Sequence, residues 1–319
     1  MPIFSKIGSR IASSTPARHI VRRSKATSLP GFRGIPIFDV VKFFIAQVKV
    51  VGIRERAAAI AFNLVMAIPP AIIFLFTLIP FFPISKQFEY NLYALIRDVV
   101  PGEKDNSVLI NFLKDFINHP RTGLLSLGFV LSMFFSSNAI MGIMRSFNKN
   151  YAGFRKRTGL QNRLAALKIT GILFIVVLLS LLLLAGQTAV LKYIGISNKS
   201  VREFIINARW VIIVLLFFTS VSYIYRHAPA VEIKWRMVNP GSILATVLMM
   251  LLTVAFSWWV SRFGNYNQLY GSIGTALILM LLIYFNSIVL LIGFELNVSI
   301  SSLKKIADER KDNAVNGVR

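Results

Sequence analysis

The stretch Gly274–Ile300, GTALILMLLIYFNSIVLLIGFELNVSI, decides the fold of this chain. Its one charged residue is Glu295, and most of the others are apolar. A helix needs roughly 17–25 mostly apolar residues to cross the hydrocarbon core of a bilayer, and this stretch is long enough to do so. The sequence therefore predicts a transmembrane helix here.

Comparable apolar runs occur along most of the chain. Of its 319 residues, 55% are hydrophobic and 15% are charged, whereas a soluble domain has about 25% charged residues. An all-α, polytopic membrane protein with about six transmembrane helices is predicted. The run at 210–225 is short and is expected to extend back into 204–209. The predicted spans are residues 57–82, 123–144, 169–186, 210–225, 242–260 and 274–300.

The net charge of +23 is explained mainly by topology. Of the 36 lysines and arginines, 26 lie before the first span, in the second and fourth connections, and after the last span. Because basic residues mark the cytoplasmic side of a membrane protein, both termini are predicted to be cytoplasmic. The basic clusters lack a recognisable nucleic-acid-binding module, so no nucleic-acid partner is expected. The chain has no cysteine, which excludes disulfides and thiolate metal sites.

The segments outside the spans have their own character. Residues 1–36 are basic and contain prolines, so we expect a disordered cytoplasmic arm; an electrostatic anchor on anionic lipids is the alternative. From 37 to 52, apolar residues at helical spacing predict an amphipathic helix along the cytoplasmic interface. Two amphipathic stretches, 88–99 and 108–117, are expected as short external helices. The predicted organisation is an arm (1–36), a membrane domain (37–303) and a cytoplasmic tail (304–319).

The first span carries two prolines near its centre. Pro69 and Pro70 lack N–H donors and leave the carbonyls of Val65 and Met66 without helical partners, which predicts a kink. Asn63 lies seven residues before Pro70, on the same side of the helix. Two interpretations stay open: a kinked packing helix, or a broken helix that lines a substrate path.

Small residues in the second span indicate close helix packing. Gly128, Ser132 and Ser136 recur every four residues, and small residues at that spacing let two helices approach each other. Asn138 differs from them, because a carboxamide within a bilayer needs a partner. We interpret Asn138 as a candidate residue of the substrate path.

The last span has polar residues on two sides. Tyr284 and Glu295 are eleven residues apart, which places them about 20° from each other around a helix. Asn286 and Asn297 share this spacing on roughly the opposite side. We therefore expect this helix to be surrounded by protein or water and to be the best candidate for the centre of the bundle.

Glu295 is the one acidic residue within the six predicted spans. An intramembrane carboxylate is by default a candidate functional group. The alternatives are that Glu295 reaches water at the cytoplasmic end or pairs with a basic residue, for which Arg54 and Arg56 are candidates. The three histidines are isolated from one another by topology, so neither a catalytic set nor a metal site is predicted.

Three segments have a recognisable pattern: Arg54–Phe74 (RERAAAIAFNLVMAIPPAIIF), the central Arg121–Leu167, and Asn239–Ile300. They resemble the YihY/BrkB family of bacterial inner-membrane proteins. The last segment contains Tyr-Gly-Ser-Ile-Gly at 270–274 and Gly-Phe-Glu-Leu-Asn at 293–297, which bracket one hydrophobic helix. The resemblance covers most of residues 37–303. The chain departs from the family in its Pro-Pro pair and in Asn63, where the family often has one proline and an aromatic residue.

This resemblance implies six helices with cytoplasmic termini, in agreement with the charge pattern. It also implies a location in the cell inner membrane. Family members have been labelled as a ribonuclease, as a serum-resistance factor and as candidates for moving lipids or envelope precursors. The ribonuclease label fits this sequence poorly, because it lacks a hydrolytic constellation.

We therefore expect a non-enzymatic membrane protein, without a cofactor, that transports or handles an anionic lipid or envelope precursor. A membrane scaffold for envelope machinery is the alternative, and a ribonuclease is the least favoured. Anionic membrane lipids are the expected partners, with a homo-oligomer or envelope proteins as further candidates. Arg54 and Arg56 would meet a head group at the cytoplasmic mouth. The predicted path residues are Asn63, Pro69, Pro70, Asn138, Tyr270, Glu295 and Asn297.

Overall fold

The computed structural model describes most of the chain as helix. Within its described residues, the remainder consists of short connections and an isolated β-bridge between Phe154 and Val231. The predicted all-α class is thus confirmed. The stretches 88–99 and 204–208 lie outside the described residues, as does most of 108–117. The structure describes residues 15–50, 52–78, 110–111, 114–115, 122–148, 154, 157–193, 209–231, 234–262 and 272–316.

The prediction of a polytopic membrane protein is also confirmed. Five helices are long and apolar enough to cross a membrane: α4, α7, α8, α11 and α13. The sixth apolar helix, α10, is shorter, as its predicted span was. The helices are α2 (Thr15–Ala26), α3 (Ile37–Val50), α4 (Ile53–Leu78), α7 (Thr122–Phe147), α8 (Gly159–Tyr193), α10 (Arg209–His227), α11 (Pro240–Arg262) and α13 (Ser272–Asn316).

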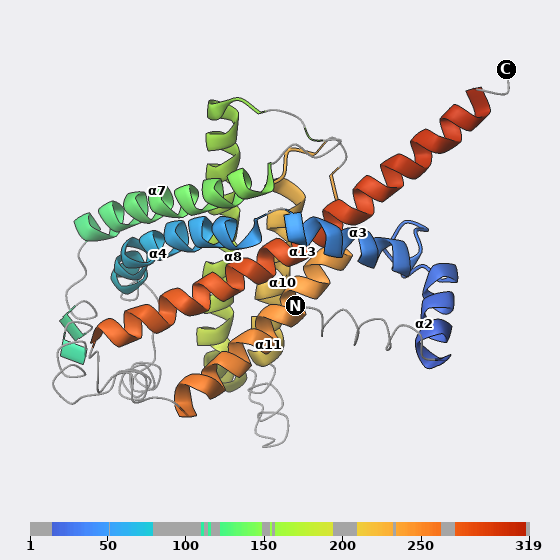
Figure 1. Ribbon diagram of the computed structural model, residues 1–319. Helices are drawn as coiled ribbons and strands as arrows, with labels where there is room; N and C mark the ends of the chain where they lie inside the picture. The colour runs from blue at the N-terminus through green and yellow to red at the C-terminus, as the bar shows by residue number, and fades with distance from the viewer. Residues whose placement is uncertain are drawn as a thin grey trace.

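The six apolar helices close into a ring. Each packs against two others, in the order α4, α7, α8, α10, α11, α13 and back to α4. Figure 1 shows α13 running diagonally through the molecule beside α4, with α3 near its C-terminal half. The other contacts of the ring join apolar helices that follow one another in the sequence, whereas the contact between α13 and α4 joins the last of them to the first.

Aromatic side chains gather around Phe294 in the buried core. Phe147 of α7 and Phe294 of α13 are fully buried and stack with their ring centroids 3.9 Å apart. The rings of Tyr225 and Trp235 both lie against Phe294, at 6.4 and 5.6 Å between centroids. Outward-facing apolar residues are exposed, as Val254 shows at 70%. Apolar side chains on both faces are typical of helices in a lipid environment.

The position of α13 agrees in part with its predicted place at the centre of the bundle. From Ser287 to Ile300 most residues are buried, with Leu291 and Glu295 at 0% exposure. From Leu277 to Phe285, by contrast, the large apolar side chains are mostly exposed. The polar residues of this helix are thus enclosed by protein near the end of the bundle that the basic residues predict to be cytoplasmic.

The N-terminal arm is more helical than we expected. Helix α2 lies inside the arm predicted to be disordered, where Lys25 sits 5.0 Å above the ring centre of Phe38. The N–H of Ile37 donates to the carbonyl of Thr27, which fixes the connection between α2 and α3. At the other end α13 continues through the predicted tail to Asn316. Local hydrogen bonds and a cation–π contact therefore order segments that composition alone marks as polar.

Two glycines let α11 and α13 touch. A Cβ atom at Gly293 would lie 2.6 Å from the carbonyl oxygen of Gly241 and 2.5 Å from the hydroxyl of Tyr225. Real Cβ atoms do not approach other atoms so closely. Neither group can easily move away, because the Gly241 carbonyl is backbone and the Tyr225 side chain is buried. The crossing of these helices therefore depends on glycine at both positions.

Replacing Gly293 by alanine should destabilise the protein by overpacking, at a cost of about 1–3 kcal/mol. The matched control is Gly159→Ala, because a Cβ at Gly159 would meet nothing within 4 Å. Thermal unfolding of both variants in detergent measures the difference. A Gly293→Ala protein as stable as Gly159→Ala would contradict the close crossing.

Candidate functional site

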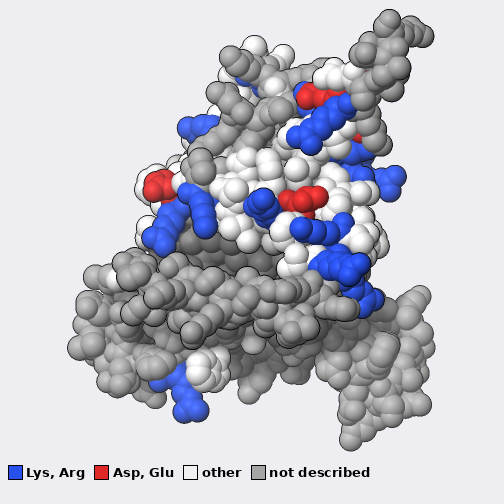
Figure 2. Space-filling view, turned by 45° about the vertical axis from the view of Figure 1, so that its right-hand side comes forward, with Lys and Arg blue, Asp and Glu red and all other residues white. Residues whose placement is uncertain are grey.

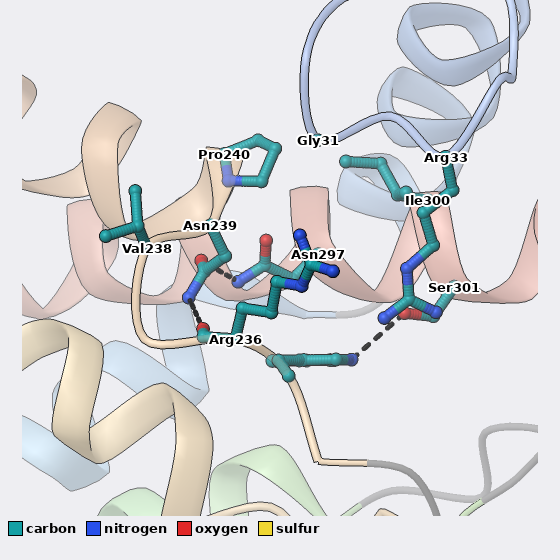
Figure 3. A pocket seen from close by; sticks show the side chains of 10 residues that line it. Gly31, Arg33, Arg236, Val238, Asn239, Pro240, Asn297, Ile300 and Ser301 are labelled. Carbon is teal, nitrogen blue, oxygen red and sulfur yellow. Dashed lines mark hydrogen bonds between the residues drawn. The ribbon is translucent and has the colours of Figure 1, made fainter.

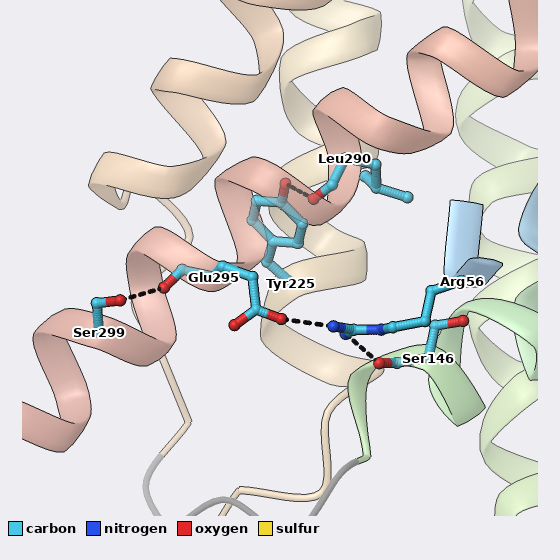
Figure 4. Close-up of polar contacts among 6 residues, drawn as sticks. All are labelled: Arg56, Ser146, Tyr225, Leu290, Glu295 and Ser299. Atoms are coloured by element: carbon cyan, nitrogen blue, oxygen red, sulfur yellow. Dashed lines mark hydrogen bonds and ion pairs between the residues drawn. The ribbon is translucent and has the colours of Figure 1, made fainter. Parts of the chain in front are cut away.

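An ion pair is buried between α4 and α13. The Nη1 atom of Arg56 donates to Oε1 of Glu295 at 2.7 Å, and the two side chains are 7% and 0% exposed. The residues are far apart in sequence, but both lie near the end of the bundle that the basic residues assign to the cytoplasm. Of the three interpretations of Glu295, the structure supports pairing with a basic residue (Figure 4).

The same guanidinium also binds the end of α7. Nη2 of Arg56 donates to the backbone carbonyl of Ser146, one of the last residues of that helix. The last four carbonyls of a helix lack partners within it and carry the negative end of its dipole. A cation is therefore the suitable cap, and Arg56 connects α4, α7 and α13 at one point.

Burial makes this connection energetically decisive. Removing one partner of a buried ion pair typically costs about 3–5 kcal/mol, because it leaves an uncompensated charge. Within a membrane no water replaces the lost partner, which makes intramembrane charges rare. The Arg56–Glu295 pair is thus the candidate functional centre of the described residues.

A second polar cluster lies on the opposite side of α13. Asn297 donates from Nδ2 to Oδ1 of Asn239 at 2.7 Å, and accepts the backbone N–H of Gly241 through its own Oδ1 at 2.9 Å. Asn239 precedes α11 and accepts the N–H of Ser242 at 2.8 Å, which is the geometry of a helix N-cap. The structure thus gives Asn297 a packing role: it holds the start of α11 against α13.

Other helix ends at this level are tied in the same way. Arg157 donates to the carbonyls of Ala228 and Pro229, at 3.1 and 3.3 Å, just after α10 ends. Partial burial lowers the pKa of its guanidinium, which stays charged because its ordinary pKa is so high. Asn148, after α7, accepts the N–H of Ala230 at 2.9 Å. The ends of α7 and α10 are therefore fixed to each other's connections.

A cavity of about 430 Å³ adjoins the second cluster. It lies between the start of α11, the later part of α13 and the segment before α3 (Figure 3). Asn239 and Asn297 line it, together with Arg33 and Arg236. This cavity was not predicted, because its walls come from segments distant in sequence.

The structure places the predicted path residues of α4 away from the ion pair. The helix continues through Pro69 and Pro70 without interruption, and Pro69 is exposed. Asn63 donates to the carbonyl of Ala59, one turn earlier, at 2.7 Å. A Cβ at Gly142 of α7 would lie 3.0 Å from Asn63, so this side chain packs at the α4–α7 interface. These contacts fit the packing interpretation of the span.

The remaining predicted residues are also separated. Asn138 accepts a hydrogen bond from Arg163 of α8, which satisfies its carboxamide oxygen at the α7–α8 interface. Arg54 is exposed and therefore accessible, whereas Arg56 is enclosed in the ion pair. Tyr270 lies outside the described residues. The structure thus brings Arg56 and Glu295 together, with Asn297 on the opposite side of α13.

Sequence reasoning missed several partners of this site. Asn239 could have been found, since Asn-Pro-Gly at the start of an apolar run is a helix N-terminus signature. Tyr225 donates to the carbonyl of Leu290 at 2.6 Å, and Ser146 contributes its own carbonyl. Because every residue has a backbone carbonyl, no sequence pattern points to the carbonyls of Leu290 and Ser146 as the acceptors. Among the described residues, no group of three or more His, Cys, Asp or Glu side chains could hold a metal ion.

Comparison with known proteins gives a consistent assignment. A family model described as "Virulence factor BrkB" matches residues 44–317. The chain is 28% identical over 261 residues to the ribonuclease-like protein YfkH of Bacillus subtilis (strain 168), covering 80% of this chain and 93% of that protein. It is 25% identical over 269 residues to a UPF0761 membrane protein of Actinobacillus pleuropneumoniae serotype 5b (strain L20), covering 81% and 91%.

A third relative, UPF0761 membrane protein NTHI0384 of Haemophilus influenzae (strain 86-028NP), is 22% identical over 260 residues. That match covers 81% of this chain and 92% of the relative. No solved structure matches the chain. Two of these names describe a membrane protein, whereas that of YfkH describes a ribonuclease-like protein.

Neutralising one member of the ion pair should destabilise the protein strongly. Arg56→Gln or Glu295→Gln alone is expected to lower the free energy of unfolding by about 3–5 kcal/mol, because the other charge stays buried. The double variant should lose less than the sum of the two, and unfolding in detergent measures this coupling.

Lys304→Gln is the matched control, since it removes the exposed Lys304–Asp308 pair on the same helix. This change should cost only about 0–1 kcal/mol. Strictly additive losses for Arg56 and Glu295 would contradict their direct interaction.

Proposed function

The chain belongs to the virulence factor BrkB family, and from this premise we propose that it handles an anionic lipid or envelope precursor in the cell inner membrane. In this proposal the chain acts without catalysis and without a cofactor. The observation that carries it is the buried Arg56–Glu295 pair between α4 and α13. A charged pair that is buried in this way is costly, which favours a functional role over a purely structural one.

The ion pair acts as a closed gate in this proposal. With Arg56 bound to Glu295, the cation is unavailable and α4 stays against α13. An anionic head group that enters between the helices replaces the carboxylate as the partner of Arg56. This exchange leaves the guanidinium compensated, but the released Glu295 carboxylate must turn to water or take up a proton, because it would otherwise remain as an isolated buried charge.

The prolines of α4 supply a place for the helix to bend. Pro69 and Pro70 remove two backbone donors, so the helix is less tightly bonded there than elsewhere. A bend at this level lets the Arg56 end of α4 move without unpacking the contact with α7 at Gly128, where the backbone of Phe74 lies close. In this mechanism Asn138 has no part, because Arg163 already binds it.

The surface charge favours an anionic partner. On the face shown in Figure 2, lysine and arginine side chains clearly outnumber acidic ones. Basic residues next to a bilayer are attracted to anionic lipids by about 1 kcal/mol each. Arg54, exposed at the start of α4, is the accessible cation nearest in sequence to the gate.

The proposal is tested by reconstituting the protein in liposomes and following a fluorescent anionic phospholipid between leaflets. The unchanged protein should speed its redistribution relative to empty liposomes. The variant Arg56→Gln/Glu295→Gln keeps a neutral, hydrogen-bonding pair at the interface but lacks the cation, so the redistribution should be lost. Lys304→Gln should behave as the unchanged protein.

Equal rates with and without the protein would overturn the proposal. A scaffold for envelope machinery would instead give stable protein partners or a homo-oligomer and no redistribution. A ribonuclease would give RNA cleavage that depends on an identifiable acidic residue.

A further inference from the structure

The cavity beside Asn297 has a cationic lining. Arg33, from the segment before α3, and Arg236, from the connection between α10 and α11, both line it and are exposed. None of the residues that line the cavity is acidic. Neither guanidinium makes a hydrogen bond or an ion pair with another residue in the described part of the chain. Figure 3 shows both side chains extending over α13 beside the cavity.

The backbone of Arg33 is held in place although its side chain is accessible. Its neighbours Phe32 and Ile35 are 7% and 8% exposed and pack in a small cluster with Val40 and Ile300. Gly31 has a φ of +91°, and a Cβ there would lie 2.8 Å from the ring of Pro240. Arg33 is therefore fixed over the start of α11, and the cavity does not depend on a loose arm.

Other donors beside the cavity, at the start of α11 and in Trp235, already make hydrogen bonds. The accessible charged donors of the cavity are therefore the two arginines. The N–H groups of Gly241 and Ser242, at the start of α11, bind Asn297 and Asn239. The indole N–H of Trp235 donates to the hydroxyl of Ser301 at 3.0 Å. The positive end of the α11 dipole still adds to the field in the cavity.

We propose that this cavity binds a phosphate monoester group through Arg33 and Arg236. Such a group carries about −1.5 to −2 charges at pH 7, which two guanidinium groups balance, and each guanidinium can bind two of its oxygens. The volume of about 430 Å³ exceeds what a phosphate ion alone fills. The phosphate is therefore carried by a larger molecule.

The outer face of α11 favours a lipid as that molecule. Val238 lines the cavity and is 63% exposed, and exposed apolar residues continue from it along one side of the helix. Acyl chains can lie against this side while the head group occupies the cavity. That the phosphate belongs to a lipid rests on the proposed function; that the cavity binds a phosphate monoester does not. The exposed stripe consists of Ile243, Val247, Leu251 and Val254.

Isothermal titration of the full chain in detergent tests the site. Dioctanoyl phosphatidic acid should bind, and dioctanoyl phosphatidylcholine, whose phosphate is a diester with a positive choline, should bind at least tenfold more weakly. Arg33→Gln and Arg236→Gln should each weaken binding of phosphatidic acid roughly tenfold or more, which corresponds to losing a charge-assisted pair. Their unfolding temperatures should not change, since both side chains are exposed.

The matched control is Lys234→Gln, which removes an exposed cation from the same connection but not from the cavity lining. Binding by this variant should equal that of the unchanged protein. Loss of affinity in Lys234→Gln equal to that in Arg236→Gln would overturn the site, because general surface charge would then explain binding. Unchanged affinity in both arginine variants would overturn it as well.

A third probe separates the two sources of phosphate. Glycerol 3-phosphate has the same monoester without acyl chains. Equal affinity for it and for phosphatidic acid would support the phosphate site but overturn the lipid source. Because binding is measured without a bilayer, its outcome is independent of lipid redistribution: binding without redistribution sinks the proposed function alone, and redistribution without binding sinks this site alone.

Discussion

A charge inside a membrane protein must find its partner within the protein, because the hydrocarbon core offers no water to replace it. Arg56 meets this requirement by binding Glu295 of α13 and the last turn of α7 at once. Three helices that are distant in sequence thereby share one point of attachment. The contact between α4 and α13 closes the ring of six apolar helices.

The same requirement explains the other ties at this level of the bundle. Arg157 binds the backbone just after α10, and Asn239 caps the start of α11, each from outside the helix concerned. A helix end leaves four backbone groups unpaired, and those groups are more expensive to leave unpaired near lipid than in water. The caps therefore do two tasks: they satisfy the backbone, and they fix neighbouring connections against each other.

The sequence was sufficient for the fold class because a membrane span is a property of composition over some twenty residues. It was less informative about the site, because partners depend on which helices meet. Glu295 could be singled out by its charge, and Arg56 was one of two candidate partners. Asn138 and Asn63 looked alike as intramembrane amides, yet each proved to be satisfied at an α7 interface. Which side chains are buried, and which partners they bind, could be read only from the three-dimensional structure.

The geometry of α13 relates the ion pair to the cavity. Glu295 and Asn297 are two residues apart, so they lie about 3 Å apart along the axis and about 200° apart around it. One therefore faces α4 and α7, and the other faces α11 and the cavity. The helix is continuous and closely packed here, so it moves as one body. In the proposed mechanism, a ligand that displaces α13 from the cavity side also changes the distance between Glu295 and Arg56, so this helix would link binding in the cavity to the ion pair.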